Sequence, residues 1–153
     1  MNKQIRSELF KDNDGIRIEF SSEILFHNKE YLTLQVHKEI QGGRSYSREQ
    51  YFVIDLNQKK ILNLLDVLHR YDISTLDIEN KISQQLKTAF NAELSDESFE
   101  DFQLISIATF YNEYPEIIKL DKETSFYLKH NILGISYDIG VASYAFEFDI
   151  KTR

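Results

Sequence analysis

The chain has 153 residues, carries a formal net charge of −7, and contains no cysteine and no tryptophan. This length suits one domain with its own core, because domains commonly have about 100–200 residues. The acidic excess disfavours nucleic-acid binding, which depends on Lys and Arg, and the lack of cysteine excludes disulfides, thiolate zinc sites and a cysteine nucleophile.

The first residues of the chain are polar. Residues 1–14 end in a turn-rich run, so we expect an N-terminal arm followed by one domain over residues 15–153. The N-terminus lacks the apolar run of a signal peptide, and no segment approaches the roughly 18 consecutive apolar residues of a membrane span. We therefore expect no membrane contact by this domain.

The first part of the domain has the period-two alternation of half-buried strands. Three strands are predicted, over about residues 16–26, 32–40 and 46–56, with the Gly42-Gly43 turn after the second. In that second strand the apolar side chains alternate with polar ones: Leu32, Leu34 and Val36 against Thr33, Gln35 and His37. This alternation predicts His37 on the outward face.

Helical periodicity follows. A short helix is expected at about residues 64–69 and a long amphipathic helix at about residues 74–93, with Ser74 as its N-cap. The apolar residues of the long helix recur at three- and four-residue spacing: Ile78, Ile82, Leu86, Ala89 and Phe90. We expect this stripe to cover one face of the sheet.

The remaining elements complete the predicted fold. Residues 95–102 resemble another capped helical turn with a solvated acidic face, and residues 103–111 return to strand periodicity. Three closing strands are predicted between Ser125 and Ile150. Strands, then helices, then strands indicate a single-domain α+β fold with a largely antiparallel sheet.

Motifs for catalysis or for cofactors are not found. The four histidines lack metal-ligand spacing, and there is no nucleophile elbow and no phosphate-binding glycine loop. We therefore expect no catalytic residue, no metal and no cofactor. Six tyrosines are candidates for a recognition surface, because tyrosine is enriched at interfaces: Tyr46, Tyr51, Tyr111, Tyr114, Tyr137 and Tyr144.

Three segments, in the same order, resemble the DUF3298 family. Residues 31–43 are similar to the family's strand that runs into a Gly-Gly turn, and residues 51–68 to its pattern F-D-L-turn-L-x-L-x-D-L-F. Phe126-Tyr127-Leu128 and Tyr137-Asp138-Ile139 are similar to its ending, F-x-L followed by Y-x-I. Arg44-Ser45 replace the Ala-His of the family's turn, so no role of that histidine carries over.

The resemblance covers about residues 15–150 and implies a function. The family includes the extracytoplasmic C-terminal domain of RsiV-type anti-sigma factors that sense lysozyme, and a non-catalytic module of some peptidoglycan deacetylases. It implies a non-enzymatic protein-binding domain of the bacterial cell envelope, periplasmic or at the cell surface, with a basic wall-acting partner such as lysozyme. The net charge of −7 is compatible with a cationic partner.

Four residues are predicted to form the contact surface because they lie at loop or edge positions beside the expected sheet: Arg44, Tyr46, Tyr137 and Tyr144. Two other functions fit the residues. If the chain is complete as given, it suits a cytoplasmic immunity-type protein that binds a toxin. A small enzyme that uses scattered carboxylates is the third hypothesis.

Overall fold

The structure, a computed structural model, describes Ile5 and residues 17–41, 46–94 and 101–150. The chain divides into two compact units. The first contains the residues up to Leu62 together with Tyr127–His130, and the second contains Asn63–Phe126 and Asn131–Arg153. The predicted arm at residues 1–14 lies, except for Ile5, outside the described residues.

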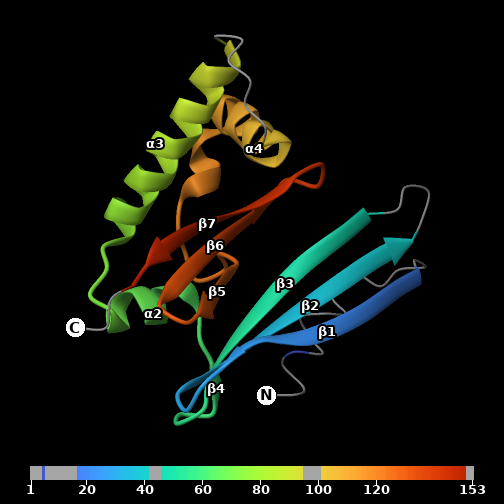
Figure 1. The fold of residues 1–153 in the computed structure, drawn as a ribbon, viewed down its shortest axis with the longest axis vertical. Coiled ribbons are helices and arrows are strands. Elements are labelled where there is room, and N and C mark those ends of the chain that lie inside the picture. Colours follow the sequence, from blue (N-terminus) through green and yellow to red (C-terminus); the bar gives the residue numbers. More distant parts are fainter. Residues whose placement is uncertain (1–4, 6–16, 42–45, 95–100, 151–153) are drawn as a thin grey trace. The chain divides into compact units, whose positions relative to one another are not determined.

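The first unit is built on a four-stranded antiparallel sheet (Figure 1). Its strands, in the order β1-β2-β3-β4, are β1 (Arg17–His27), β2 (Tyr31–Gln41), β3 (Tyr46–Asp55) and β4 (Lys60–Ile61). The register sets Ser21 opposite His37 and His37 opposite Glu49, and it shifts between Ile24 and Phe26. The three predicted strands are therefore confirmed, and the register shift places an irregularity within β1.

The buried side of β2 changes along the strand. Tyr31 and Thr33 are buried near its start, whereas Val36 and Ile40, which point to the opposite face, are buried towards its end. Thr33 belongs to the polar set of the alternation, yet none of its surface is exposed. Its hydroxyl donates a 2.6 Å hydrogen bond to the carbonyl oxygen of Leu128, so the polar group is satisfied without water.

The closing strands do not extend the first sheet. They form a separate three-stranded sheet in the order β5-β6-β7, with β5 at Phe126–Lys129, β6 at Ile132–Asp138 and β7 at Ser143–Asp149. Within the second unit, β6 and β7 pair antiparallel from Ile132 opposite Asp149 to Asp138 opposite Ser143. The predicted strands are present, but the expected single sheet is two sheets.

The two helices predicted between residues 64 and 93 are present in the structure. In α2 (Leu64–Arg70), Asn63 and Asp66 form a capping box, which satisfies two backbone N–H groups at the helix start. The side chain of Ser74 accepts a 3.3 Å hydrogen bond from the Asp77 N–H at the start of α3 (Thr75–Leu94). The contacts of α3 are mainly with α4 and η1 rather than with a sheet face.

The predicted strand at residues 103–111 is wrong, because this segment forms α4 (Phe102–Glu113). Asp101 caps it by accepting a 3.1 Å hydrogen bond from the Leu104 N–H. The buried residues of α4 recur at helical spacing: Leu104, Ile107, Ala108 and Tyr111. Burial against α3 therefore decides this segment in favour of a helix, and Pro115 begins a 3₁₀ helix, η1 (Pro115–Ile118), directly after it.

The second unit has a helical layer in which α3 and α4 lie side by side (Figure 1), and α4 also packs against β7. The hydroxyl groups of Ser83 on α3 and Tyr111 on α4 are 2.6 Å apart and hydrogen-bonded. The antiparallel sheets and the helices confirm the predicted α+β class. Among the described residues, no helix combines the length and the apolar content needed to cross a membrane.

Candidate functional site

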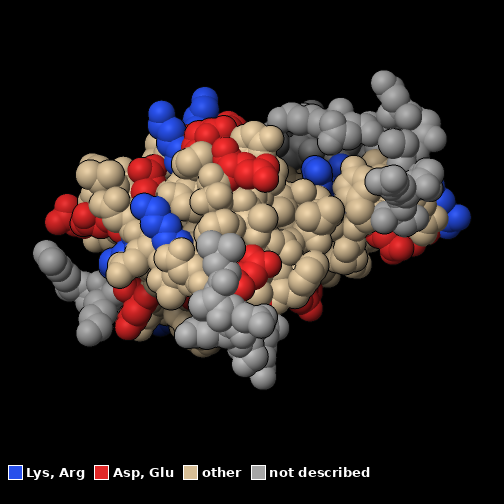
Figure 2. Space-filling model, turned by 90° about the horizontal axis from the view of Figure 1, so that it is seen from above, with Lys and Arg blue, Asp and Glu red and all other residues tan. Residues whose placement is uncertain are grey.

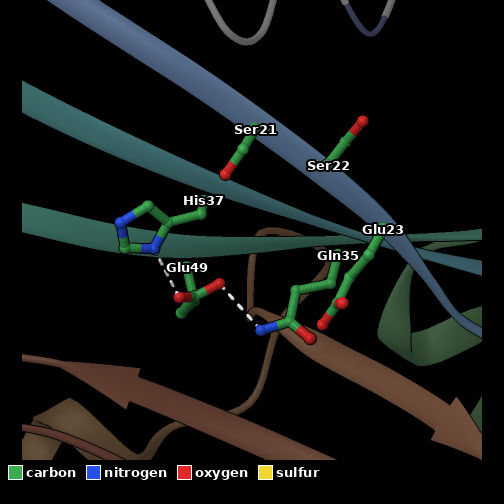
Figure 3. Close-up of a pocket in the computed structure, with 6 residues that line it drawn as sticks. All are labelled: Ser21, Ser22, Glu23, Gln35, His37 and Glu49. Carbon is green, nitrogen blue, oxygen red and sulfur yellow. Dashed lines mark hydrogen bonds and ion pairs between the residues drawn. The ribbon is translucent and has the colours of Figure 1, made fainter.

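A polar hollow with a volume of about 320 Å³ lies on the sheet of the first unit. Six side chains from three adjacent strands line it: Ser21, Ser22 and Glu23 from β1, Gln35 and His37 from β2, and Glu49 from β3. The close-up in Figure 3 shows the amide of Gln35 between the carboxylates of Glu23 and Glu49. Strand alternation brings the odd-numbered residues of this set to one face of the sheet.

Glu49 is the centre of the hydrogen bonding in the hollow (Figure 3). One carboxylate oxygen lies 2.7 Å from Nδ1 of His37, and the other accepts a 2.8 Å hydrogen bond from Nε2 of Gln35. An ionised carboxylate only accepts hydrogen bonds, so Nδ1 of His37 is the donor in this contact, and in the neutral form of an imidazole the other nitrogen, here Nε2, carries no hydrogen. His37 and Glu49 are both partly open to solvent, with 43% and 32% of their side chains exposed.

Glu23 provides the second carboxylate of the hollow. It stands opposite Gln35 in the register of β1 and β2, and it is exposed. Among the described residues, none donates a hydrogen bond to its carboxylate. In the part of the chain that the structure describes, the hollow therefore has one carboxylate that is hydrogen-bonded and one that is exposed and accepts no hydrogen bond.

Beyond the hollow, the same face of β2 and β3 becomes buried. The ring of Tyr51, opposite Gln35, contacts the ring of Tyr127 with centroids 5.0 Å apart. Burial, and then the negative charge of Glu49, raise the pKa of Tyr51 above its usual value, so this phenol stays neutral at ordinary pH. Polar residues therefore give way to a packed aromatic pair along this face.

The four predicted contact residues do not form one cluster. Arg44 lies outside the described residues. Tyr46 in β3 is 40% exposed and has the guanidinium carbon of Arg48 at 5.2 Å from its ring centroid. Because it is an even-numbered residue of β3, Tyr46 points to the face opposite to that of Glu49.

Tyr137 and Tyr144 belong to the second unit, where they stand opposite each other on β6 and β7. Both rings contact Phe146, with centroid distances of 5.8 and 4.9 Å. The hydroxyl of Tyr137 donates a 3.2 Å hydrogen bond to the carbonyl oxygen of Ile118, so it is held inside the fold. Tyr144 is half-buried and keeps part of its ring at the surface.

The wider set of tyrosine candidates is also divided by the structure. Tyr111 is buried between α3 and α4, so it is wrong as a surface candidate. Tyr114 is 47% exposed and contacts Phe110 with ring centroids 4.9 Å apart. Exposure of tyrosine therefore depends on packing that the residue type does not reveal.

A second hollow of about 480 Å³ lies within the second unit, at the seam between α3 and the segment formed by α4 and η1. Its walls include Leu86 and Ala108, which are core residues of that seam, and no carboxylate lines it. Its lining is thus largely a continuation of the packing between the helices. The hollow on the first sheet is the stronger candidate, since polar groups of several kinds converge there.

Sequence reasoning found only one member of this hollow, His37, and treated it as an ordinary surface histidine. The sequence feature that could have revealed the other members is the alternation of side chains along three successive strands. It assigns alternate positions of each strand to one face: Ser21 and Glu23 in the first, Gln35 and His37 in the second, and Glu49 in the third. The registers between strands were missing, and these decide which alternate positions become neighbours.

No protein-family model matches the chain, and no curated protein matches it. Among solved structures, it is similar to the crystal structure of a DUF3298 family protein (PA4972) from Pseudomonas aeruginosa PAO1, with 12% sequence identity and a TM-score of 0.49. The similarity covers 95% of this chain and 63% of that protein, so the chain spans less than two thirds of its length. The solved neighbour thus comes from the family that the sequence motifs resemble.

Proposed function

We propose that this chain is a non-enzymatic domain that binds a basic protein partner through the hollow on β1–β3. The observation that supports this proposal most is the pair of carboxylates, Glu23 and Glu49, which lie on either side of the Gln35 amide. A lysine or arginine side chain complements this arrangement, because its ammonium or guanidinium group donates several hydrogen bonds and carries the opposite charge. The hollow is then a recognition site for a cationic side chain.

Binding suits the hollow better than catalysis. Both oxygens of Glu49 are engaged by neighbouring side chains, and Glu23 and His37 are open to solvent. Enzymes that use a carboxylate as a catalytic acid or base generally place it in an enclosed site that perturbs its protonation. An open, hydrogen-bonded rim is more typical of a protein interface.

The distribution of charged side chains on the surface suggests that the partner binds at particular carboxylates rather than to a broad acidic patch. Figure 2 shows acidic and basic side chains interspersed over the face in view, rather than gathered by sign. The net charge of −7 favours encounter with a cationic protein, whereas the position of binding depends on specific carboxylates. Tyr46 and Tyr144 remain proposals for additional contacts on their own surfaces.

The family resemblance of the sequence supports a more specific proposal. We propose that the partner is a basic wall-acting protein such as lysozyme, and that the domain works at the bacterial cell envelope, in the periplasm or at the cell surface. These assignments come from the resemblance of residues 31–43, 51–68, 126–128 and 137–139 to the DUF3298 patterns.

Isothermal titration calorimetry with lysozyme tests the proposal. We expect binding near one-to-one that weakens between about 0.01 M and about 0.15 M salt, because the Debye length falls from roughly 30 to roughly 8 Å. Succinylated lysozyme, in which lysine charges are reversed, is the matched control and is expected not to bind. Absence of heat with native lysozyme at both salt concentrations would reject lysozyme as the partner.

A further inference from the structure

We infer that the charge of His37 regulates the binding of cationic groups in this hollow, so that mild acidification releases a basic partner. The inference rests on the proposed function and adds a regulation to the same site. It follows from one contact: the imidazole of His37 is bonded directly to Glu49, one of the two carboxylates that would receive the cation.

The geometry lets His37 gain a proton without losing this contact. Nδ1 lies 2.7 Å from Oε1 of Glu49 and already carries a hydrogen, so an additional proton binds at Nε2. With 43% of the His37 side chain exposed, water can deliver that proton. The same hydrogen bond then becomes an ion pair, and the positive charge stays within the hollow.

Protonation of His37 would halve the net negative charge of the hollow. With a neutral imidazole, Glu23 and Glu49 together present two negative charges. With a charged imidazole, Glu49 is compensated and one negative charge remains. Histidine is the side-chain type whose charge ordinarily changes between about pH 5 and pH 8.

Other charged and titratable groups also face His37. On β1, Glu19 forms a 2.7 Å ion pair with Arg17, and on β2 Glu39 is the next residue on the face of His37. Phenols also lie on this face, at Tyr51 on β3 and at Tyr127, the ring that Tyr51 contacts. As side-chain types, carboxylates ordinarily titrate near pH 4 and phenols near pH 10.

The expected effect is a decrease in affinity of about three- to tenfold between about pH 7.5 and about pH 5.5. A unit charge a few ångströms from a bound cation interacts by roughly 1 kcal/mol where the site is solvated, and a tenfold change corresponds to about 1.4 kcal/mol.

The test is an NMR titration of the ¹⁵N-labelled chain with acetylated, amidated tetralysine, whose four ammonium groups stay charged at both pH values. We expect amide shifts centred on Ser21–Glu23, Gln35–His37 and Glu49, and weaker binding at the lower pH. In His37→Gln the affinity should be the same at both pH values, because the glutamine amide can bond to Glu49 but cannot gain a charge. His69→Gln, an exposed histidine on α2, is the matched control and should keep the pH dependence.

The outcomes separate this inference from the proposed partner. Equal affinity at both pH values in the wild type overturns the inference, and so does an unchanged pH dependence in His37→Gln. Shifts that lie away from the hollow also overturn it, even if lysozyme binds. Shifts at the hollow with the expected pH dependence uphold it, even if calorimetry rejects lysozyme.

Discussion

The hydroxyl of Thr33 on β2 donates a 2.6 Å hydrogen bond to the carbonyl oxygen of Leu128, a residue 95 positions later in the chain. Both residues belong to the first unit, and neither group is exposed to water. The bond therefore fixes Tyr127–His130 on the sheet that carries the hollow, and it explains why a polar residue can occupy the centre of a buried face.

Replacing Thr33 by valine is expected to lower the free energy of unfolding by about 1–3 kcal/mol, because the buried carbonyl oxygen of Leu128 loses its partner. Urea denaturation followed by circular dichroism measures the change. Thr88→Val on the exposed side of α3 is the matched control, since the Thr88 hydroxyl bonds only to Gln84 in the same helix. Equal losses in the two variants would contradict the role of the bond to Leu128.

Removing negative charge from the hollow is expected to weaken lysozyme binding. The double variant Glu23→Gln with Glu49→Gln should lower the affinity by about tenfold or more at low salt, because both proposed partners of the cation lose their charge. Calorimetry compares it with Glu113→Gln with Glu116→Gln, which removes the same net charge from exposed positions in the second unit. If both doubles weaken binding equally, general charge attraction rather than the hollow is responsible.

Tyr137 is expected to make the fold sensitive to alkali. Its burial, followed by the negative charges of Glu79 and Asp121, raises the pKa of its phenol far above the ordinary value. Above about pH 10 the unfolded chain releases this proton and the folded chain retains it, so the free energy of unfolding falls by up to about 1.4 kcal/mol per pH unit. This contribution is fully present below pH 10 and is lost as the pH rises.

Urea unfolding at pH 8, 10 and 11 checks the alkaline effect. Tyr137→Phe should lose about 1 kcal/mol at pH 8, because the hydrogen bond to Ile118 is gone, and should show a shallower fall above pH 10. Tyr114→Phe, which removes an exposed phenol, serves as the control and should follow the wild type. Parallel curves for wild type and Tyr137→Phe would refute the assignment.

The capping box at the start of α2 gives a prediction about local stability. Asn63→Ala removes the side-chain oxygen that accepts a 3.0 Å hydrogen bond from the Asp66 N–H, and should cost about 1 kcal/mol. Thermal and urea unfolding measure the loss. Asn91→Ala, an exposed substitution inside α3, should cost nothing, since alanine favours the helix interior. A similar loss at both positions would argue against the cap.

Most elements of the fold were predictable from local patterns, and the exceptions have a common cause. Residues 103–111 contain Ile105 and Ile107, which suggest alternation, but Leu104, Ala108 and Tyr111 satisfy a helical spacing equally well. Packing against α3 selects the helix. Thr33 shows the same limit, because its burial depends on the carbonyl group of Leu128.

The candidate site was less predictable than the fold. Each of its strands showed a polar face in the sequence, but a hollow requires that Glu23 stand opposite Gln35 and that His37 stand opposite Glu49. A shift of one residue in either register would bring other side chains together.

The sequence by itself determined the α+β class, the positions of β1–β3 and of the closing strands β5–β7, the helices α2 and α3 with Ser74 at the start of α3, and an acidic chain without cysteine chemistry. These properties depend on composition and on periodicity within a few residues. The tertiary structure decided that the strands form two sheets, that α4 is a helix, and that His37, Gln35 and Glu49 form one hydrogen-bonded group. Those outcomes depend on pairing and packing between segments distant in the chain, and local side-chain patterns do not encode them uniquely.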